Sequence, residues 1–228
     1  MKVKVNVLQK QISPSHYLTF EYEGGPDDSV AKLLRYYNEE ALSRGDEQIA
    51  WECGCMINKC GACAMRINGV PRLACSSFLY EYEEGKIILE PLSKFPHVKD
   101  LITDRSAVFE ALKRVNVYHA GPVHQDEKTL ESRFESAGCL NCGCCLEVCP
   151  NFNIKKNYTG AAAAVNGYRI AAAADGKAQL KEMRKAYAKH YYEGCGISLA
   201  CHDICPAGIP VEDLISRSNA ALVWGRRV

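Results

Sequence analysis

The cysteines of this sequence are the residues whose spacing points most clearly to chemistry. The chain of 228 residues contains 13 cysteines, and most of them fall into three groups. The first group is Cys55, Cys60, Cys63 and Cys75. The second group is Cys139, Cys142, Cys145 and Cys149. The third group is Cys195, Cys201 and Cys205. Soft thiolates grouped in this way are typical ligands of iron–sulfur clusters, so the sequence predicts an electron carrier with three cluster sites.

The first group has the spacing of plant-type ferredoxins. Segments of four and two residues separate its first three cysteines, and the fourth lies further along the chain. This pattern holds a [2Fe–2S] cluster. Gly54 and Gly61 allow the backbone to wrap closely around a cluster, and amides directed at the sulfurs help to set its potential.

The third group repeats the second with one ligand missing. Steps of 3, 3 and 4 residues separate the cysteines of the second group, and the same steps lead from Cys195 through Ser198 and Cys201 to Cys205. Proline follows the last cysteine of both runs. Ser198 therefore stands where a cysteine would complete the repeat.

The ligand sets follow from a crossing rule. In bacterial ferredoxins, three cysteines of such a run bind one cluster and the fourth, before proline, binds another. The rule predicts a [4Fe–4S] set that consists of Cys139, Cys142, Cys145 and Cys205. It leaves a three-cysteine set that consists of Cys149, Cys195 and Cys201. A cubane short of one thiolate tends to lose an iron, so we expect [3Fe–4S] there. Ligation by Ser198 as an alkoxide is the minor alternative, because the pKa of serine is high.

Disulfides and zinc are the competing explanations of the cysteines. An odd cysteine count without a visible secretory signal argues against a disulfide framework. Zinc fits the CxxC pairs, but it would not require Cys145 and Cys149 in the same register or a proline after each run. Cys53 and Cys144 lie outside the ligand spacings, and we expect them to be packed thiols near a cluster.

Residue periodicity predicts an α+β chain of two domains. We expect residues 1–96 to form a β-grasp plant-type [2Fe–2S] ferredoxin domain. Its predicted strands are 3–8, 17–22, 64–67 and 86–90, and its predicted helix is 29–43. We expect Asp27 and Asp28 to cap that helix and Gly45 to end it.

The remaining residues, 97–228, are expected to form an all-α, bacterial-ferredoxin-like domain that binds two clusters. The predicted helices are 104–117, 129–137, 160–174, 177–192 and 210–223. Alanine is the best helix former, so the tracts 161–164 and 171–174 predict a tightly packed helix near the clusters.

Charge and hydropathy exclude other classes of protein. The net charge of +1 gives no indication of nucleic-acid binding. No apolar run is long enough to cross a bilayer, and the alternating start is not a signal peptide. We expect a chain that is soluble by itself, made in a reducing compartment, and able to sit on a membrane as a peripheral subunit.

Over nearly its full length the sequence resembles the iron–sulfur subunits of succinate dehydrogenases and fumarate reductases. The resemblance rests on the order of the three groups and on their local sequences. These are CysGlyAlaCysAlaMet at 60–65, ArgLeuAlaCys at 72–75, CysLeuAsnCysGlyCysCysLeuGluValCysPro at 139–150 and AlaCysHisAspIleCysPro at 200–206.

The resemblance implies two partners. A flavoprotein with covalent FAD would interconvert succinate and fumarate, and a membrane anchor would present quinone beside the [3Fe–4S] site. This chain would relay electrons between them on the cytoplasmic face of a bacterial inner membrane. It would be an enzyme subunit with no catalytic residues of its own. The sequence does not indicate the direction of the reaction.

The sequence departs from the ubiquinone-linked members of this family. Those members carry a tryptophan pair shortly after the CysPro of the second group and a histidine after the first cysteine of the third. The corresponding positions here are Asn153, Ile154 and Gly196. The resemblance therefore favours the bacterial forms linked to menaquinone, which often have dihaem cytochrome b anchors.

Two other functions compete with this interpretation. A fumarate reductase with a thiol or another soluble donor usually carries extra cysteine-rich domains, for which a chain ending at Val228 would leave no room. A free-standing electron carrier or redox sensor would usually be strongly acidic. His202 is expected either near quinone or bonded to a cluster sulfur. A solvated helix face, rather than a partner site, is expected for the basic residues Lys181, Arg184, Lys185 and Lys189.

Overall fold

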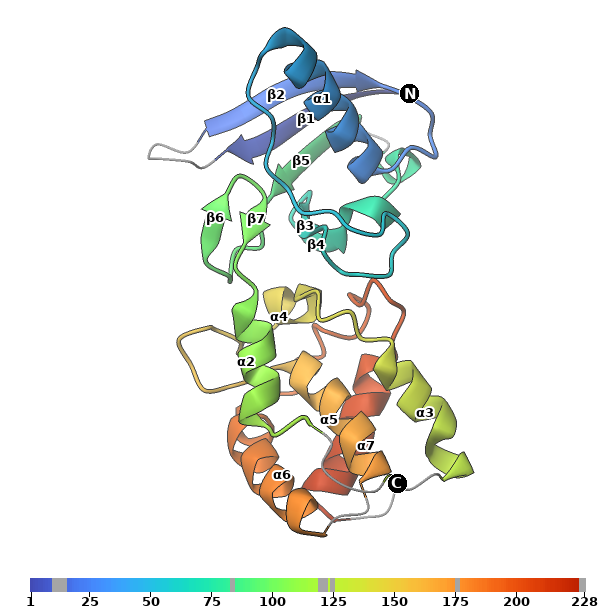
Figure 1. Cartoon of the computed structure of the whole chain (residues 1–228), viewed down its shortest axis with the longest axis vertical. Coiled ribbons are helices and arrows are strands. Elements are labelled where there is room, and N and C mark those ends of the chain that lie inside the picture. The colour runs from blue at the N-terminus through green and yellow to red at the C-terminus, as the bar shows by residue number, and fades with distance from the viewer. Residues whose placement is uncertain (10–15, 83–84, 119–122, 124–125, 175–176, 226–228) are drawn as a thin grey trace. The chain divides into compact units, whose positions relative to one another are not determined.

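The computed structural model divides the chain into two compact units, Met1–Asp104 and Arg105–Val228. It describes all residues except 10–15, 83–84, 119–122, 124–125, 175–176 and 226–228 (Figure 1). The first unit combines a mixed sheet with a helix, and the second is built from helices. The expected α+β class is consistent with this composition.

The first unit is organised around a five-stranded sheet in the order β2-β1-β5-β3-β4. Its strands are β1 (Lys2–Gln9), β2 (His16–Glu23), β3 (Ala64–Ile67), β4 (Val70–Leu73) and β5 (Lys86–Glu90). Strand β1 pairs antiparallel with β2 and parallel with β5, so that Val5 faces both Phe20 and Ile87. The alternating valines of β1 are buried, as expected for a strand with one face in a core.

Helix α1 (Val30–Arg44) packs against this sheet. The ring of Phe20 on β2 lies 4.4 Å from that of Tyr37 on α1. The predicted cap was wrong by one residue, because Ser29 is the N-cap and its side chain accepts a hydrogen bond from Lys32 N. Gly45 ends the helix with φ 75°, a left-handed conformation that glycine adopts without strain.

Short elements of the first unit were not predicted. They are strand β4, the 3₁₀ turns η1 (Ala74–Ser76) and η2 (Leu79–Glu81), and the hairpin strands β6 (His97–Lys99) and β7 (Ile102–Thr103). Each is too short to produce a recognisable period in the sequence. Asp100, at the turn of that hairpin, is fully buried and accepts a hydrogen bond from Ala50 N, which ties the turn to the chain before the cysteine loop.

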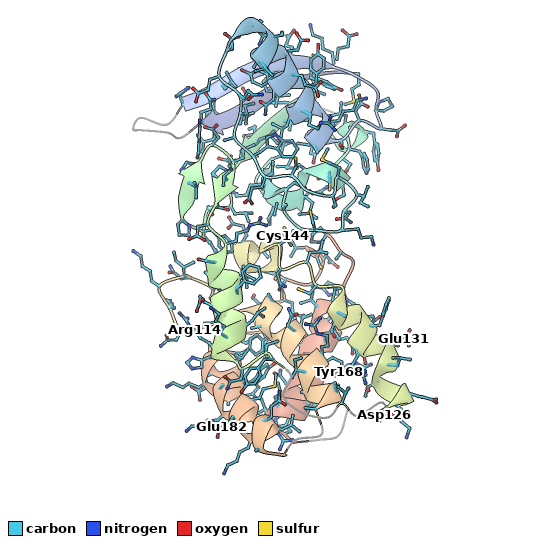
Figure 2. All side chains as sticks on the ribbon, in the orientation of Figure 1. Arg114, Asp126, Glu131, Cys144, Tyr168 and Glu182 are labelled. Atoms are coloured by element: carbon cyan, nitrogen blue, oxygen red, sulfur yellow. The ribbon has the colours of Figure 1, made fainter. Side chains whose placement is uncertain are left out.

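The second unit is arranged around helix α5 (Ala161–Ala173), which packs against four other helices. These are α2 (Ser106–Arg114), α3 (Glu127–Ala137), α4 (Cys144–Val148) and α7 (Val211–Leu222). The first alanine tract is buried, as predicted, because small side chains let the neighbouring helices approach closely. Tyr168 of α5 is fully buried and shares a 2.7 Å hydrogen bond with Ser132 of α3 (Figure 2).

The remaining elements of this unit are helix α6 (Lys177–His190) and the turn η3 (Tyr192–Gly194). The five predicted helices are all present, with ends that differ by at most three residues from those predicted. Helix α4 was not predicted because it has only five residues. None of the helices that the structure describes is long and apolar enough to cross a membrane.

Candidate metal centres

The first cysteine group lies in a loop between α1 and β3, with Cys75 in turn η1. Cys63 and Cys75 are buried, Cys55 is half-buried and Cys60 is exposed. The loop is tightly curved: Met56 and Asn58 have φ 58° and Gly61 has φ 73°. Backbone in this region directs successive amides to one side of the chain.

Backbone amides in this loop point at the cysteine sulfurs. Ile57 N and Lys59 N donate to Cys55 Sγ, at 3.4 and 3.1 Å. Asn58 N donates to Cys75 Sγ at 3.3 Å. These donors lower the pKa of Cys55 to about 7, whereas burial raises the pKa of Cys63 to about 12. An amide cradle of this kind stabilises negative charge on sulfur, which is the environment that a cluster ligand requires.

Gly54 allows the close approach that the sequence predicted. A Cβ atom at this position would lie 3.2 Å from Cys60 Sγ, so a side chain would press on the sulfur. The amides and the tight packing together fit a bound [2Fe–2S] group.

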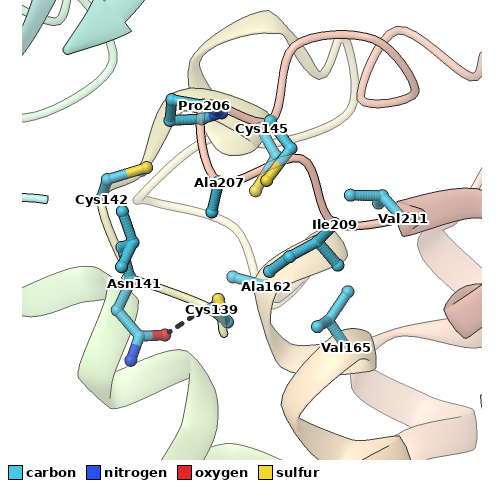
Figure 3. Close-up of a pocket in the computed structure, with 13 residues that line it drawn as sticks. Cys139, Asn141, Cys142, Cys145, Ala162, Val165, Pro206, Ala207, Ile209 and Val211 are labelled. Atoms are coloured by element: carbon cyan, nitrogen blue, oxygen red, sulfur yellow. Dashed lines mark hydrogen bonds between the residues drawn. The ribbon is translucent and has the colours of Figure 1, made fainter. Parts of the chain in front are cut away.

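Four cysteines from both runs line one cavity in the second unit. They are Cys139, Cys142, Cys145 and Cys205, the set that the crossing rule predicted for [4Fe–4S]. Figure 3 shows the first three of them around the cavity, together with the apolar side chains Ala162 and Val165 of α5. Cys149 is not among the residues that line it.

Local structure explains how the second run curls around this cavity. Asn141 has φ 50° and Gly143 has φ 90°, and α4 begins directly after Gly143. Cys139 Sγ lies 3.6 Å from Asn141 Oδ1. Asn166 of α5 is buried and also bonds to Asn141, at 3.2 Å, so a polar network secures this side of the cavity.

A second cavity of about 450 Å³ gathers the other three cysteines. Cys149, Cys195 and Cys201 all line it, and so does Ser198. The fold thus brings Cys149 towards the third group and separates it from its sequence neighbours. Residues on both sides of Ser198 are in the left-handed region, with φ 51° at Ile197 and 53° at Leu199.

The three sites do not show ligand geometry for a single ion. Within the described part of the chain, no three His, Cys, Asp or Glu side chains are grouped as the ligands of one metal would be. The fit of multi-iron clusters therefore rests on the amides around the first group and on the cavity linings of the other two.

Cys53 and Cys144 differ from each other. Cys144 is fully buried at the start of α4 (Figure 2), as expected of a packed thiol. Its thiol hydrogen-bonds to Cys142 and lowers the pKa of Cys142 to about 7, an effect that the guanidinium of Arg105 reinforces. Cys53 is exposed, so the expectation of a packed thiol was wrong for this residue.

His202 faces carboxylates rather than sulfur. Its Nδ1 lies 2.6 Å from Glu212 Oε2 and its Nε2 lies 3.0 Å from Asp203 Oδ1. The contact with Glu212 becomes an ion pair when His202 is protonated. The interaction with Glu212 raises the pKa of His202.

The basic face of α6 is largely solvated. Lys181, Lys185 and Lys189 are exposed, as predicted. Arg184 is different, because it is half-buried and donates through Nε to Ala221 O at the end of α7, 3.3 Å away.

Sequence reasoning missed the aromatic lining of the third site. Tyr158, Tyr191 and Trp224 line the cavity with the cysteines. The only local signal was the pair of tyrosines just before Cys195, and a helix core would produce the same pattern.

Comparison with known proteins supports a cluster-binding chain. Residues 2–110 match the family described as 2Fe-2S iron-sulfur cluster binding domain, and residues 135–209 match the 4Fe-4S dicluster domain family. The succinate dehydrogenase iron-sulfur subunit of Bacillus subtilis is 36% identical over 215 residues, which cover 88% of this chain and 83% of that protein. The fumarate reductase iron-sulfur subunit of Wolinella succinogenes is 28% identical over 234 residues, covering 94% and 93%.

A solved structure has the same fold. A chain of the Mycobacterium smegmatis Sdh1 complex in the apo form superimposes with a TM-score of 0.75 at 21% identity, covering 96% of this chain and 94% of that one. The fold and the cysteine groups define an iron–sulfur protein with a [2Fe–2S] domain and a dicluster domain. The chain belongs to the family of iron–sulfur subunits of succinate dehydrogenases and fumarate reductases, as the sequence resemblance indicated.

Proposed function

We propose that this chain relays electrons between the FAD of a flavoprotein and a membrane quinone, as the iron–sulfur subunit of a succinate:quinone or quinol:fumarate oxidoreductase. Bound clusters would supply one-electron transfer, and succinate or fumarate would react on the partner. The single observation that carries the proposal is the gathering of cysteines from distant parts of the second unit around two separate cavities. The first unit adds a cysteine loop of its own.

We infer the cluster types from the ligand sets. Cys55, Cys60, Cys63 and Cys75 would hold [2Fe–2S] in a β-grasp ferredoxin domain. Cys139, Cys142, Cys145 and Cys205 would hold [4Fe–4S] in a bacterial-ferredoxin-like domain. Cys149, Cys195 and Cys201 would hold [3Fe–4S] in the same domain. Support comes from the amides that donate to the first set and from the cavities that the other two sets line.

The protein residues have clear tasks in this scheme. The loop amides stabilise charge on the sulfurs of the first set. The apolar side chains of α5 and α7 exclude water from the second, which makes the local charges interact more strongly. Burial of this kind is one of the factors that set cluster potentials.

We infer that a membrane anchor covers the surface near the third site. Ile197 is 75% exposed, Leu199 50% and Trp224 55%, and all three also line the cavity of Cys149. An exposed apolar group beside a redox site indicates a protein or membrane interface. The subunit would then be peripheral on the cytoplasmic face of a bacterial inner membrane, with a dihaem cytochrome b anchor and menaquinone as acceptor or donor.

The test is anaerobic purification of the complex from membranes, with a tag on this chain. We expect a flavoprotein and a haem-binding membrane protein to co-purify, and roughly nine iron atoms per copy of this chain, the sum for the three cluster types. Succinate should reduce the clusters only when the flavoprotein is present.

Three results would contradict the proposal. Zinc with little acid-labile sulfide would exclude the clusters. Purification of this chain alone with a full cluster content would favour a free-standing carrier. Activity with soluble thiols but not with a menaquinol analogue would favour the fumarate reductase with a soluble donor.

A further inference from the structure

Two tyrosine hydroxyls point at the cysteines of the third site. Tyr191 Oη donates a hydrogen bond to Cys195 Sγ, 3.6 Å away. The Tyr158 hydroxyl is within hydrogen-bonding reach of both Cys149 and Cys195. Both rings line the cavity in which these cysteines lie. Two of the three thiols therefore have a phenol as a neighbour.

The position of Tyr191 is determined by the end of α6. The residue follows the helix directly, and its amide donates to Tyr187 O at 2.9 Å. Its side chain is fully buried and lies against the ring of Tyr187, with centroids 4.9 Å apart. Tyr191 lies only four positions before Cys195, so the helix end determines the distance from hydroxyl to sulfur.

Tyr158 is held against the other side of the same segment. Its ring stacks on Tyr191 with centroids 5.8 Å apart. A Cβ atom at Gly194 would lie 2.5 Å from Tyr158 Cδ2, so the ring packs directly on the backbone before Cys195. The amide of the next residue, Thr159, donates a hydrogen bond to His190 O at 2.9 Å. This bond connects the segment that contains Tyr158 to the end of α6.

Tyr187 provides a contrast within the same aromatic group. It is as deeply buried as Tyr191, but its hydroxyl donates to Asn219 Oδ1 on α7, 2.9 Å away. The acceptor of the Tyr187 hydroxyl is therefore an amide oxygen and not a cysteine sulfur. The three tyrosines thus share a packing environment and differ in where their hydroxyls point.

We propose that Tyr191 and Tyr158 are positioning residues that raise the reduction potential of the cluster at Cys149, Cys195 and Cys201 by donating hydrogen bonds to its ligand sulfurs. The inference rests on the proposed function, because it takes that cluster to be present. Reduction adds negative charge that the thiolates share. A donor aimed at sulfur therefore stabilises the reduced state more than the oxidised state.

The phenols are suited to act as permanent donors. The ordinary pKa of a tyrosine hydroxyl is about 10, so a phenol carries its proton at neutral pH. A phenol also has no charge, so it can lie beside the cluster without the desolvation cost of a buried lysine or arginine. A high potential at the terminal site would favour the delivery of electrons from the other clusters to it.

The experiment compares three phenylalanine variants of the purified complex: Tyr191→Phe, Tyr158→Phe and Tyr187→Phe. Each removes one hydroxyl and preserves the ring. A redox titration followed by the EPR signal of the oxidised third cluster gives its midpoint potential. We expect Tyr191→Phe and Tyr158→Phe to lower the equilibrium constant for reduction about tenfold, a shift of about 59 mV for one electron. We expect Tyr187→Phe to leave the midpoint potential of the third cluster unchanged.

The outcomes separate this inference from the proposed function. If the unmodified complex lacks a [3Fe–4S] signal, the proposed function fails in that respect. If the signal is present and neither Tyr191→Phe nor Tyr158→Phe moves its potential, the inference is wrong. An equal shift in Tyr187→Phe would also overturn it, since packing would then be the cause. Should Tyr191→Phe fail to assemble, Tyr158→Phe decides the question alone, because Tyr158 lines the same cavity as the ligands.

Discussion

Ser198 lines the same cavity as Cys149, a residue that belongs to the other cysteine run of the sequence. Cys195 and Cys201, the other two cysteines of the predicted set, also line this cavity. The serine therefore has the location that a fourth ligand would need. Its hydroxyl is a poor substitute for a thiolate, because iron–sulfur clusters prefer soft ligands.

Replacing Ser198 with cysteine should convert the third site to [4Fe–4S]. The added thiolate completes a four-cysteine set, and the altered cluster type and charge should lower the potential of the site. EPR of the oxidised complex measures the change, and we expect the [3Fe–4S] signal to disappear. Quinone-linked activity should fall, while succinate oxidation with an artificial dye should persist.

The matched control is Ser216→Cys, because Ser216 lines the same cavity. It lies outside the repeat of ligand spacings, so we expect the signal to remain. Full intensity of the [3Fe–4S] signal in Ser198→Cys would show that residue 198 does not occupy the vacant corner.

Removing Cys149 should affect the third cluster and spare the first. Cys149→Ala takes one sulfur from the cavity shared with Cys195 and Cys201. We expect loss of the oxidised-state [3Fe–4S] EPR signal and an unchanged [2Fe–2S] signal, because the ligands of the first site are in another unit. Cys53→Ala is the control, since Cys53 is exposed and outside the ligand spacings. Loss of the [4Fe–4S] signal with retention of [3Fe–4S] would reverse the assignment.

The two glycines Gly160 and Gly208 should differ in their tolerance of alanine. Both have positive φ, 73° and 67°, so alanine costs about 1–2 kcal/mol at either position. At Gly160 a Cβ atom would also collide with Leu146 Cδ2, whereas nothing lies within 4 Å at Gly208. Overpacking should add about 1–3 kcal/mol for Gly160→Ala. Denaturant unfolding followed by circular dichroism compares the variants, and equal midpoints would refute the predicted collision.

Asp28 should stabilise the start of α1 over a wide pH range. Its carboxylate accepts from Lys32 Nζ at 2.5 Å, Tyr22 Oη at 2.8 Å and Gly25 N at 3.0 Å. The bond from Lys32 is the main cause of the lowered pKa of Asp28. Because the folded pKa is lowered, this stabilisation is complete above the ordinary aspartate pKa of about 4 and disappears as the pH falls through the folded value.

Hydrogen exchange of β2 and α1 tests this prediction. Asp28→Asn should lower the free energy of local opening of this region by about 1 kcal/mol, equally at pH 5 and pH 8. The control is Asp27→Asn, because Asp27 is exposed. We expect no comparable change in that variant. An effect of Asp28→Asn that is present at pH 8 and absent at pH 5 would be inconsistent with a lowered pKa.

Much of this protein could be predicted from local sequence. The cysteine intervals indicated three ligand groups, and the family that they implied is confirmed by the relatives. The main helices and the strands β1, β2, β3 and β5 followed from periodicity. These features are local, since spacing along the chain and alternation of burial are properties of short segments.

Tertiary structure decided what depends on contacts between distant residues. The parallel pairing of β1 with β5 and the packing of α5 against its neighbours have no local signal. The sequence could not distinguish exposed Cys53 from buried Cys144, because both lie within two residues of a ligand. Nor could it show that the hydroxyl of Tyr191 reaches sulfur while that of Tyr187 reaches Asn219. Both tyrosines are equally apolar in a periodic pattern, and only the end of α6, docked beside α7 and the third cysteine group, determines what each hydroxyl meets.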